Sequence, residues 1–153
     1  MAVGNELFTS PDFSTVPQMF WHGVRQRGAA IMMRQKEFGI WRAYGWNEVG
    51  EIVSNVAAGL ASLGLEPGMV VSVLANTSRE WVWADLGTLT AGGVVNGIYP
   101  TDAASQVQFL CFDSGTRFLF VEDAEQLDKY LEVREHLPDV RNVIVFEIGR
   151  AHV

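Results

Sequence analysis

Three histidines and one cysteine are the residues of this 153-residue sequence best suited to bind a metal or act as a nucleophile. His22, His136 and His152 have no Cys, His or carboxylate partner at the spacing of a known metal site. We interpret His22 as a structural or surface residue and His136 as a cation favoured at a helix C-terminus. Cys111 falls on the apolar face of a predicted helix, which indicates a small buried side chain.

Phosphate-binding loops have recognisable glycine and lysine spacings, and none occurs here. The glycine pair in 92–94 lacks the G-x-G-x-x-G spacing and follows a predicted helix instead of opening one. Lys36 and Lys129 are the only lysines, and neither follows a glycine-rich loop or precedes Ser or Thr. A receiver-type module needs acidic residues at strand ends, but the first two buried strands end in Ala75-Asn76 and Tyr99-Pro100.

Two further groups could form a site, and each has a simpler interpretation. Glu122, Asp123 and Glu125 make a local acidic cluster, which a solvated helix start favours without any metal. Trp81 and Trp83 are expected to be packing anchors and not a binding box. The sequence therefore predicts no catalytic, cofactor-binding or metal-binding residue in this chain.

Charge and composition limit the class of protein. The net charge is −7, which argues against a nucleic-acid partner and against electrostatic docking on anionic lipid. A single cysteine excludes an internal disulfide and fits a reducing, cytoplasmic location. The N-terminus has no basic and apolar signal regions. Apolar stretches fall short of the ~20 residues of a membrane span.

The elements that must position any site alternate between helices and strands. Periods of 3–4 residues predict helices, and short β-branched runs predict strands. The expected helices cover 17–27, 46–63, 79–91, 103–113 and 124–136. The expected strands cover 29–33, 39–44, 69–75, 94–99, 117–121 and 142–146, the first two joined as a hairpin through 34–38. Ser78, Thr101 or Asp102, and Asp123 are the expected helix caps.

This alternation indicates βαβ units. The run MVVSVLA at 69–75 is typical of a strand that is buried on both faces. The predicted fold class is therefore α/β, a layered domain with a mainly parallel sheet and flanking helices. The strand at 94–99 is also predicted to be buried.

The order of segments resembles a known family. Tyr44-Gly-Trp-Asn-Glu48, then 58–68, then Val71-Ser-Val-Leu-Ala-Asn76 and Ser78-Arg-Glu-Trp81 are similar to the N-terminal domain of AMP-forming acyl-CoA synthetases. Residues 97–101 with 106–109, followed by 120–134, resemble the long-chain fatty-acid–CoA ligase branch. One departure is Gly45, where the family usually has a Thr or Ser cap.

The resemblance implies a parent enzyme that converts ATP, a fatty acid and CoA to acyl-CoA, AMP and pyrophosphate, with Mg²⁺. In the family, the phosphate loop, the nucleotide motifs and the catalytic lysine lie downstream of this segment. No catalytic or nucleotide-binding residue is therefore carried over, and Gly92 and Pro100 carry over only as fold-shaping positions. The expected partners are the remainder of the parent and its substrates, with peripheral membrane association of the parent left open.

The expected organisation is a flexible lead-in at 1–14, a partial and incomplete N-terminal AMP-binding-enzyme domain at 15–147, and a tail at 148–153 that is not native. ATC GGA AGA GCA CAC GTC, a common sequencing-adapter string, encodes this last hexapeptide, which motivates that hypothesis. The chain by itself is expected to be inactive. Two alternatives stay open: a stand-alone, non-catalytic α/β binding module, or a fragment of another adenylating ligase.

Overall fold

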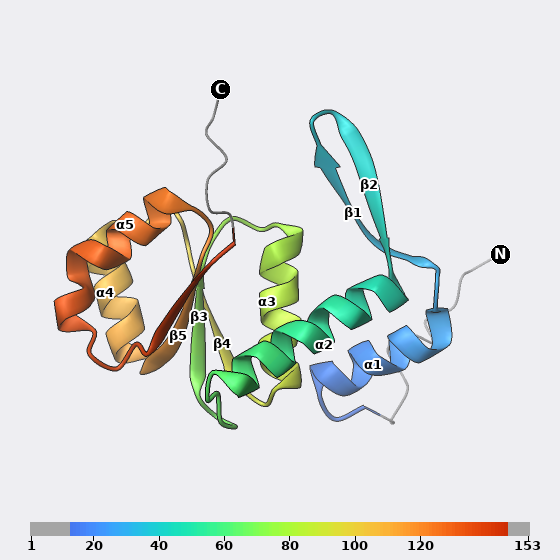
Figure 1. The fold of residues 1–153 in the computed structure, drawn as a ribbon, viewed down its shortest axis with the longest axis horizontal. Helices are drawn as coiled ribbons and strands as arrows, with labels where there is room; N and C mark the ends of the chain where they lie inside the picture. The colour runs from blue at the N-terminus through green and yellow to red at the C-terminus, as the bar shows by residue number, and fades with distance from the viewer. Residues whose placement is uncertain (1–12, 147–153) are drawn as a thin grey trace.

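The computed structural model describes residues 13–146, which form a parallel sheet flanked by helices and a separate hairpin that projects from this body (Figure 1). The predicted tail at 148–153 lies outside the described residues, as does nearly all of the lead-in at 1–14. The helices are α1 (Val16–Arg27), α2 (Trp46–Ser62), α3 (Arg79–Thr90), α4 (Ala104–Asp113) and α5 (Ala124–Val133), with a 3₁₀ turn, η2 (Arg134–His136). The strands are β1 (Ile31–Glu37), β2 (Ile40–Gly45), β3 (Val70–Leu74), β4 (Val94–Ile98), β5 (Thr116–Val121) and β6 (Asn142–Val145).

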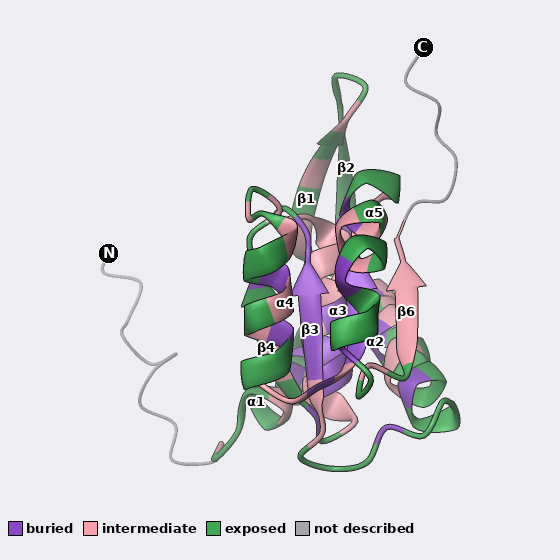
Figure 2. Cartoon of the chain, turned by 90° about the vertical axis from the view of Figure 1, so that its left-hand side faces the viewer, coloured by how far each residue is buried: buried purple, intermediate pink, exposed green. Residues whose placement is uncertain are grey.

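The predicted parallel sheet is confirmed. Its strand order is β4-β3-β5-β6, and each neighbouring pair is parallel. Because side chains alternate along a strand, β3 contributes to two cores. Val71 and Val73 pack with residues of α2 and α3, whereas Leu74 packs with residues of α4 and α5. In Figure 2, β3 is buried from its second residue onward while the outer sides of α4 and α5 are exposed.

Strand β4 departs from the prediction, because it is an edge strand and is not fully buried. It pairs with β3 on one side, and no described strand pairs with its other side. Val94 at its start is 49% exposed. A short β-branched run has the same composition at an edge as in a sheet centre, so the pattern did not separate the two cases.

The hairpin is longer and its turn tighter than predicted. β1 continues to Glu37, and the turn consists of Phe38 and Gly39, both at positive φ (47° and 81°). Two residues at positive φ match the twist of paired strands, which is the usual geometry of a two-residue hairpin loop. The prediction of a loop over 34–38 was wrong because these polar residues are strand residues whose alternate side chains contact α3.

Two of the predicted helix caps are confirmed and the third is wrong. The side chain of Ser78 accepts a hydrogen bond from the backbone N–H of Trp81, and Asp123 accepts one from Gln126. Helix α4 begins later than expected, with Ala103 in the cap position, and the Gln106 side chain accepts from the Ala103 N–H at 3.0 Å. Within residues 13–146, no helix has the length and apolar character needed to cross a bilayer.

Helices α2 and α3 cross at close range because a glycine lies at their contact. A Cβ added to Gly87 would lie 2.4 Å from Cγ1 of Val56. Helix α3 therefore buries a face of small residues, Ala84, Gly87 and Thr88, in addition to Leu86. This buried face is wide because α3 packs on both the sheet and α2.

We predict that Gly87→Ala lowers the free energy of unfolding by about 1–3 kcal/mol, because the new methyl group overpacks the α2–α3 contact. Gly59→Ala, in helix α2, is the control: a Cβ there meets nothing within 4 Å. That change should raise stability by up to about 1 kcal/mol, through helix propensity alone. Urea denaturation of both variants measures the difference, and a Gly87→Ala protein as stable as Gly59→Ala would contradict the packing argument.

Candidate functional site

A cavity lies where β3 and β4 end, at the carboxyl edge of the sheet. Ligands of open α/β sheets bind at this edge. The cavity has a volume of about 420 Å³ and is lined by Ala75, Asn76, Thr77, Trp81, Gly97, Ile98, Tyr99 and Pro100. This lining contains no charged side chain. A triphosphate or a divalent cation needs opposite charge around it, so these residues fit neither group. A small, neutral or flat group beside Trp81 matches the lining better.

A hydrogen-bonded carboxylate joins the ends of β3 and β5 beside this cavity. Helix α3 packs on one face of the sheet and α5 on the other, so the chain diverges between the ends of β3 and β5. There, Oε2 of Glu122 accepts hydrogen bonds from the backbone N–H of Asn76 at 2.7 Å and from its side-chain amide at 2.9 Å. A carboxylate therefore lies at the point of the sheet where open α/β proteins usually bind their ligands, and it is already bonded to Asn76.

The three carboxylates of the predicted acidic cluster have three separate roles. Glu122 bonds to Asn76, Asp123 caps α5, and Glu125 lies 3.7 Å from the amine of Lys129. The same amine donates to the carbonyl of Pro100 at 2.5 Å. Within the described part of the chain, no group of three His, Cys, Asp or Glu side chains could hold a metal.

A second polar cluster, centred on Arg79, attaches the hairpin to α3. The backbone N–H of Arg79 donates to the side chain of Gln35 at 2.8 Å. Its guanidinium pairs with Glu37 of β1 and with Glu80, the latter at 2.5 Å, and donates to the hydroxyl of Tyr44. Desolvation opposes the charge, but Glu80, Tyr44 and Glu37 together raise the pKa of Arg79 above its usual value. The charged guanidinium therefore links the start of α3 to the hairpin.

Aromatic rings surround this cation. The guanidinium carbon lies 5.5 Å from the ring centres of both Tyr44 and Trp83, and these two rings meet edge to face at 5.6 Å. Tyr44 is 1% exposed. Trp83 is therefore a packing anchor, as predicted, whereas Trp81 both packs against the core and lines the cavity.

The sequence reasoning missed Arg79 and Tyr44 as a cluster. One signal was available: Arg79 is the first residue of α3, where the helix dipole disfavours a cation. A cation in that position needs carboxylate partners from elsewhere. Their identity depends on how the hairpin packs, which the local sequence does not specify.

His22, His136 and Cys111 are not among the residues that line the cavity. His22 contacts the ring of Phe13 at 4.8 Å between ring centres, and His136 is exposed in η2. His152 lies outside the described residues. Cys111 is 1% exposed, and burial raises the pKa of its thiol while hydrogen bonds with Thr116 and Ser72 oppose the shift. The prediction of a small buried side chain is confirmed for Cys111.

Of the two positions expected to shape the fold, Gly92 has a backbone conformation that requires its residue type. Gly92 has φ of 85° in the turn that ends α3, a conformation that favours glycine, and it packs against Pro67. Pro100 ends the segment after β4 and lines the cavity. Lys36, which matches no phosphate loop, lies on the exposed side of β1.

An open parallel sheet that reverses its strand order at β3, with helices on both faces, defines an α/β protein of the doubly wound kind. The anthranilate CoA ligase AuaEII, solved with anthranoyl-AMP, has this arrangement: it superposes with a TM-score of 0.78 at 20% identity, covering 90% of this chain and 26% of that protein. This likeness shows the fold. The sequence pattern of the family described as AMP-binding enzyme matches residues 20–152, and the chain belongs to that family.

Comparison by sequence gives relatives of a narrower class, the long-chain-fatty-acid–CoA ligases. The long-chain-fatty-acid–CoA ligase ACSBG1 of Bos taurus is 30% identical over 132 residues, which is 86% of this chain and 18% of that protein. The long-chain-fatty-acid–CoA ligase heimdall of Drosophila melanogaster is 35% identical over 104 residues, 68% of this chain and 15% of that protein. The resemblance to the N-terminal part of such ligases is confirmed, and the chain spans less than a fifth of their length.

We predict that Arg79→Met loosens the hairpin, because Glu37, Glu80 and Tyr44 lose their shared donor. The free energy of unfolding should fall by about 1–3 kcal/mol, and amide hydrogen exchange in β1 and β2 should accelerate. Arg42→Met is the matched control, since Arg42 pairs with Glu48 at 3.4 Å on the exposed surface and should change stability by less than about 1 kcal/mol. Equal effects of the two substitutions would contradict the role given to Arg79.

Asp85 supplies a pH-dependent test. It is half-buried on α3, and burial raises the pKa of its carboxyl. Because the pKa of Asp85 is higher in the folded than in the unfolded chain, its contribution to the free energy of unfolding is most favourable at a pH below the unfolded pKa. That contribution is lost as the pH rises through the folded pKa. Asp85→Asn should therefore stabilise the protein at pH ~7, by less than about 1 kcal/mol because the group is half-exposed, and lose this advantage in acid. Denaturation midpoints across pH measure it; an advantage that grows in acid would contradict it.

Proposed function

We propose that the chain is the N-terminal segment of a long-chain fatty-acid–CoA ligase, which joins a fatty acid to AMP and then transfers the acyl group to CoA. The observation that carries the proposal is the 30–35% identity to enzymes with this name over 68–86% of the chain. The parent would use ATP, Mg²⁺ and CoA. Its fatty acid, its nucleotide and the rest of its polypeptide are the partners of the segment.

We further propose that this segment performs no ligase chemistry alone. Formation of an acyl-adenylate requires a carboxylate oxygen to attack the α-phosphate while pyrophosphate leaves, and cations must stabilise the developing charge. The cavity at the carboxyl edge has no charged side chain in its lining, and the nearby Glu122 carboxylate is already bonded to Asn76. The described residues therefore do not fit ATP, and residues from elsewhere in the parent must bind it.

The role left for the segment is that of a scaffold, and its surface supports this. Among residues 13–146, no strand pairs with the outer edge of β4, and apolar side chains at and beyond its ends are exposed, including Val94 and Tyr99. An edge of this kind is a template for pairing with further polypeptide or for aggregation. This favours a segment of a larger enzyme over a stand-alone binding module, which would be expected to protect its edges.

The remaining alternative is a fragment of another adenylating ligase. The anthranilate CoA ligase has the same fold in this region, but the likeness at 20% identity carries no information on the acid. Acid specificity would reside in pockets that this segment does not contain. The choice between these ligases therefore depends on the full-length parent.

The activity prediction compares the chain with its parent. The purified 153-residue chain should release no pyrophosphate above background from ATP with palmitate, because the cavity at the carboxyl edge of its sheet has no charged side chain in its lining. The full-length protein, recovered from the source gene, should release pyrophosphate with palmitate and much less with anthranilate. Turnover by the chain alone would refute the scaffold role, and a preference of the parent for anthranilate would refute the long-chain assignment.

A further inference from the structure

One asparagine of the sequence precedes a glycine, at Asn96-Gly97 in β4. In this dipeptide the backbone nitrogen of the glycine can attack the side-chain amide carbon of the asparagine, because glycine has no Cβ that shields its nitrogen or restricts its backbone. The five other asparagines precede Glu, Val or Thr, whose side chains hinder the same attack. Loss of the side-chain amide is therefore favoured by sequence at Asn96 above the others.

The backbone nitrogen of Gly97 points to the outer edge of β4. The N–H of Val94 donates to the carbonyl of Met69, just before β3, at 2.9 Å. In a parallel pair, alternate residues direct their backbone groups to the same neighbour, so Asn96 also bonds to β3 while Gly97 faces the other side. Among residues 13–146, no strand pairs with that side, and Gly97 is exposed. The attacking nitrogen therefore has no strand partner to lose.

The side-chain amide of Asn96 begins a chain of hydrogen-bonded hydroxyls. Its nitrogen donates to Oγ of Ser72 at 3.0 Å and to Oγ of Ser114 at 3.3 Å. Oγ1 of Thr116 lies 2.6 Å from the first of these oxygens and 2.9 Å from the second. Ser114 donates onward to the carbonyl of Leu110 at 2.7 Å. A carboxylate in place of the amide would have no hydrogen to donate and would add a charge beside this buried network.

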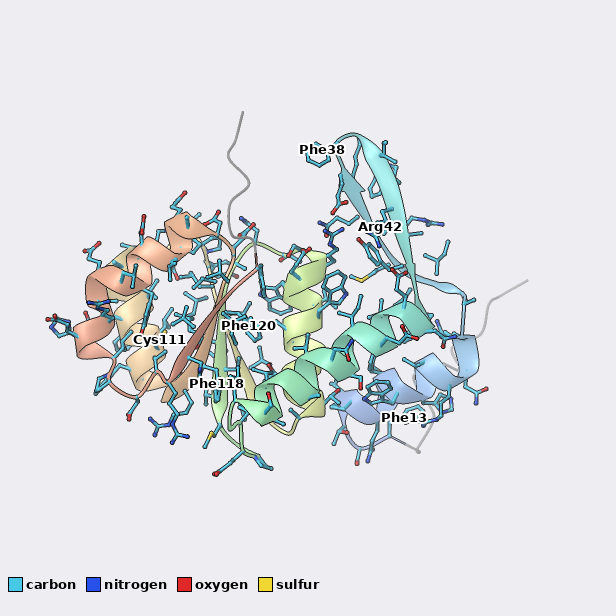
Figure 3. The ribbon with its side chains drawn as sticks, in the orientation of Figure 1. Phe13, Phe38, Arg42, Cys111, Phe118 and Phe120 are labelled. Carbon is cyan, nitrogen blue, oxygen red and sulfur yellow. The ribbon has the colours of Figure 1, made fainter. Side chains whose placement is uncertain are left out.

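The dipeptide lies between the core under α4 and the cavity at the carboxyl edge of the sheet. Cys111, which Figure 3 labels between α4 and the sheet, packs in the same core as Ile98 of β4. Side chains alternate along a strand, so Asn96 shares this face with Ile98. Gly97 belongs to the opposite face, where it lines the cavity with Trp81. A change at this dipeptide would therefore affect both faces of the sheet.

The reaction needs a local opening of β4. An extended backbone holds the nitrogen of Gly97 away from the side chain of Asn96, and attack requires rotation about the Cα–C bond of Asn96. An edge strand loses one set of ladder bonds when it opens, whereas the central β3 would lose two. Segments with fewer bonds open more often. The edge position of β4 therefore allows a motion that a central strand would suppress.

We propose that Asn96-Gly97 is a site of spontaneous deamidation in the folded chain. The nitrogen of Gly97 forms a bond to Cγ of Asn96, the bond from Cγ to Nδ2 breaks, and the amide leaves as ammonia with the proton of the Gly97 N–H. Water then opens the cyclic imide at either carbonyl, which gives aspartate or isoaspartate. The inference goes beyond the proposed function and does not depend on ligase activity.

Both products change the pairing of β4. Each adds a negative charge beside Ser72 and Ser114 and removes the donor that these hydroxyls share. Isoaspartate also adds a methylene group to the main chain, which shifts the rest of β4 against β3 and turns its side chains to the wrong face. The wall of the cavity formed by residues 97–100 would be displaced with it.

The test follows the masses of tryptic peptides while the purified 153-residue chain is kept at mildly alkaline pH and body temperature. Trypsin cleaves after Arg79 and Arg117, so the peptide 80–117 contains Asn96 as its only asparagine. Its mass should rise by the exchange of an amide NH₂ for a hydroxyl, and tandem spectra should place the change at residue 96. The adjoining peptide, 43–79, is the internal control, because none of its asparagines precedes glycine. A sample digested at time zero corrects for deamidation during digestion.

Gly97→Ala isolates the contribution of the glycine. A Cβ at this position would lie 3.7 Å from Cζ2 of Trp81, an ordinary contact, so the variant should fold. It keeps Asn96 and its hydrogen bonds, but deamidation at residue 96 should slow at least about tenfold, because the methyl group hinders the attacking nitrogen. Gly59→Ala, where a Cβ meets nothing within 4 Å, is the matched control that should leave the rate unchanged. Circular dichroism checks that both variants keep their fold.

Urea distinguishes local opening of β4 from unfolding of the whole chain. Local opening exposes little surface, so the rate should be nearly constant at urea concentrations below the unfolding transition. Reaction through the unfolded chain would rise steeply with the first additions of urea. The proposal fails if the rate follows the unfolded fraction, if peptide 80–117 gains no more mass than peptide 43–79, or if Gly97→Ala reacts as fast as the wild type.

Discussion

Strand β3 is the constraint on which the sheet depends, because it has hydrogen-bonded strands on both edges and helices on both faces. Its position leaves no exposed side for a polar residue, yet the strand contains Ser72 at 0% exposure. The hydroxyl lies 2.6 Å from that of Thr116 and accepts from the Asn96 amide at 3.0 Å. An unpaired buried hydroxyl would cost about 1–3 kcal/mol, so this polar link across β4, β3 and β5 also fixes how the strands align.

The Asn76–Glu122 and Arg79 clusters follow the carboxyl end of β3 and connect it to other elements. The first joins the ends of β3 and β5 through a carboxylate, and the second joins the start of α3 to the hairpin. Both use charged groups for internal contacts. The edge where an α/β protein usually binds its ligand therefore carries structural charges, which agrees with a scaffold that receives its chemistry from the rest of a ligase.

The sequence was sufficient to predict the fold class, the helices and the parallel sheet, since these follow from hydrophobic period and β-branched runs. The helix caps Ser78 and Asp123 followed from local hydrogen-bonding chemistry. The edge position of β4 could not be predicted, because it depends on strand order. The Arg79 cluster could not be predicted either, since its partners come from β1 and β2, more than thirty residues away. No site residue was expected, and the clusters found are contacts between distant segments.

The central place of β3 also affects the order in which the chain can assemble during synthesis. Ser72 and Asn96 are 24 residues apart, whereas Ser72 and Thr116 are 44 apart. The longer closure costs only about 0.6 kcal/mol more in chain entropy. During synthesis on a ribosome, however, β4 emerges before β5. One edge of β3 therefore has no partner strand until β5 has been made. During that interval an apolar strand is available to other nascent chains, a period in which a chaperone would be most useful to this polypeptide.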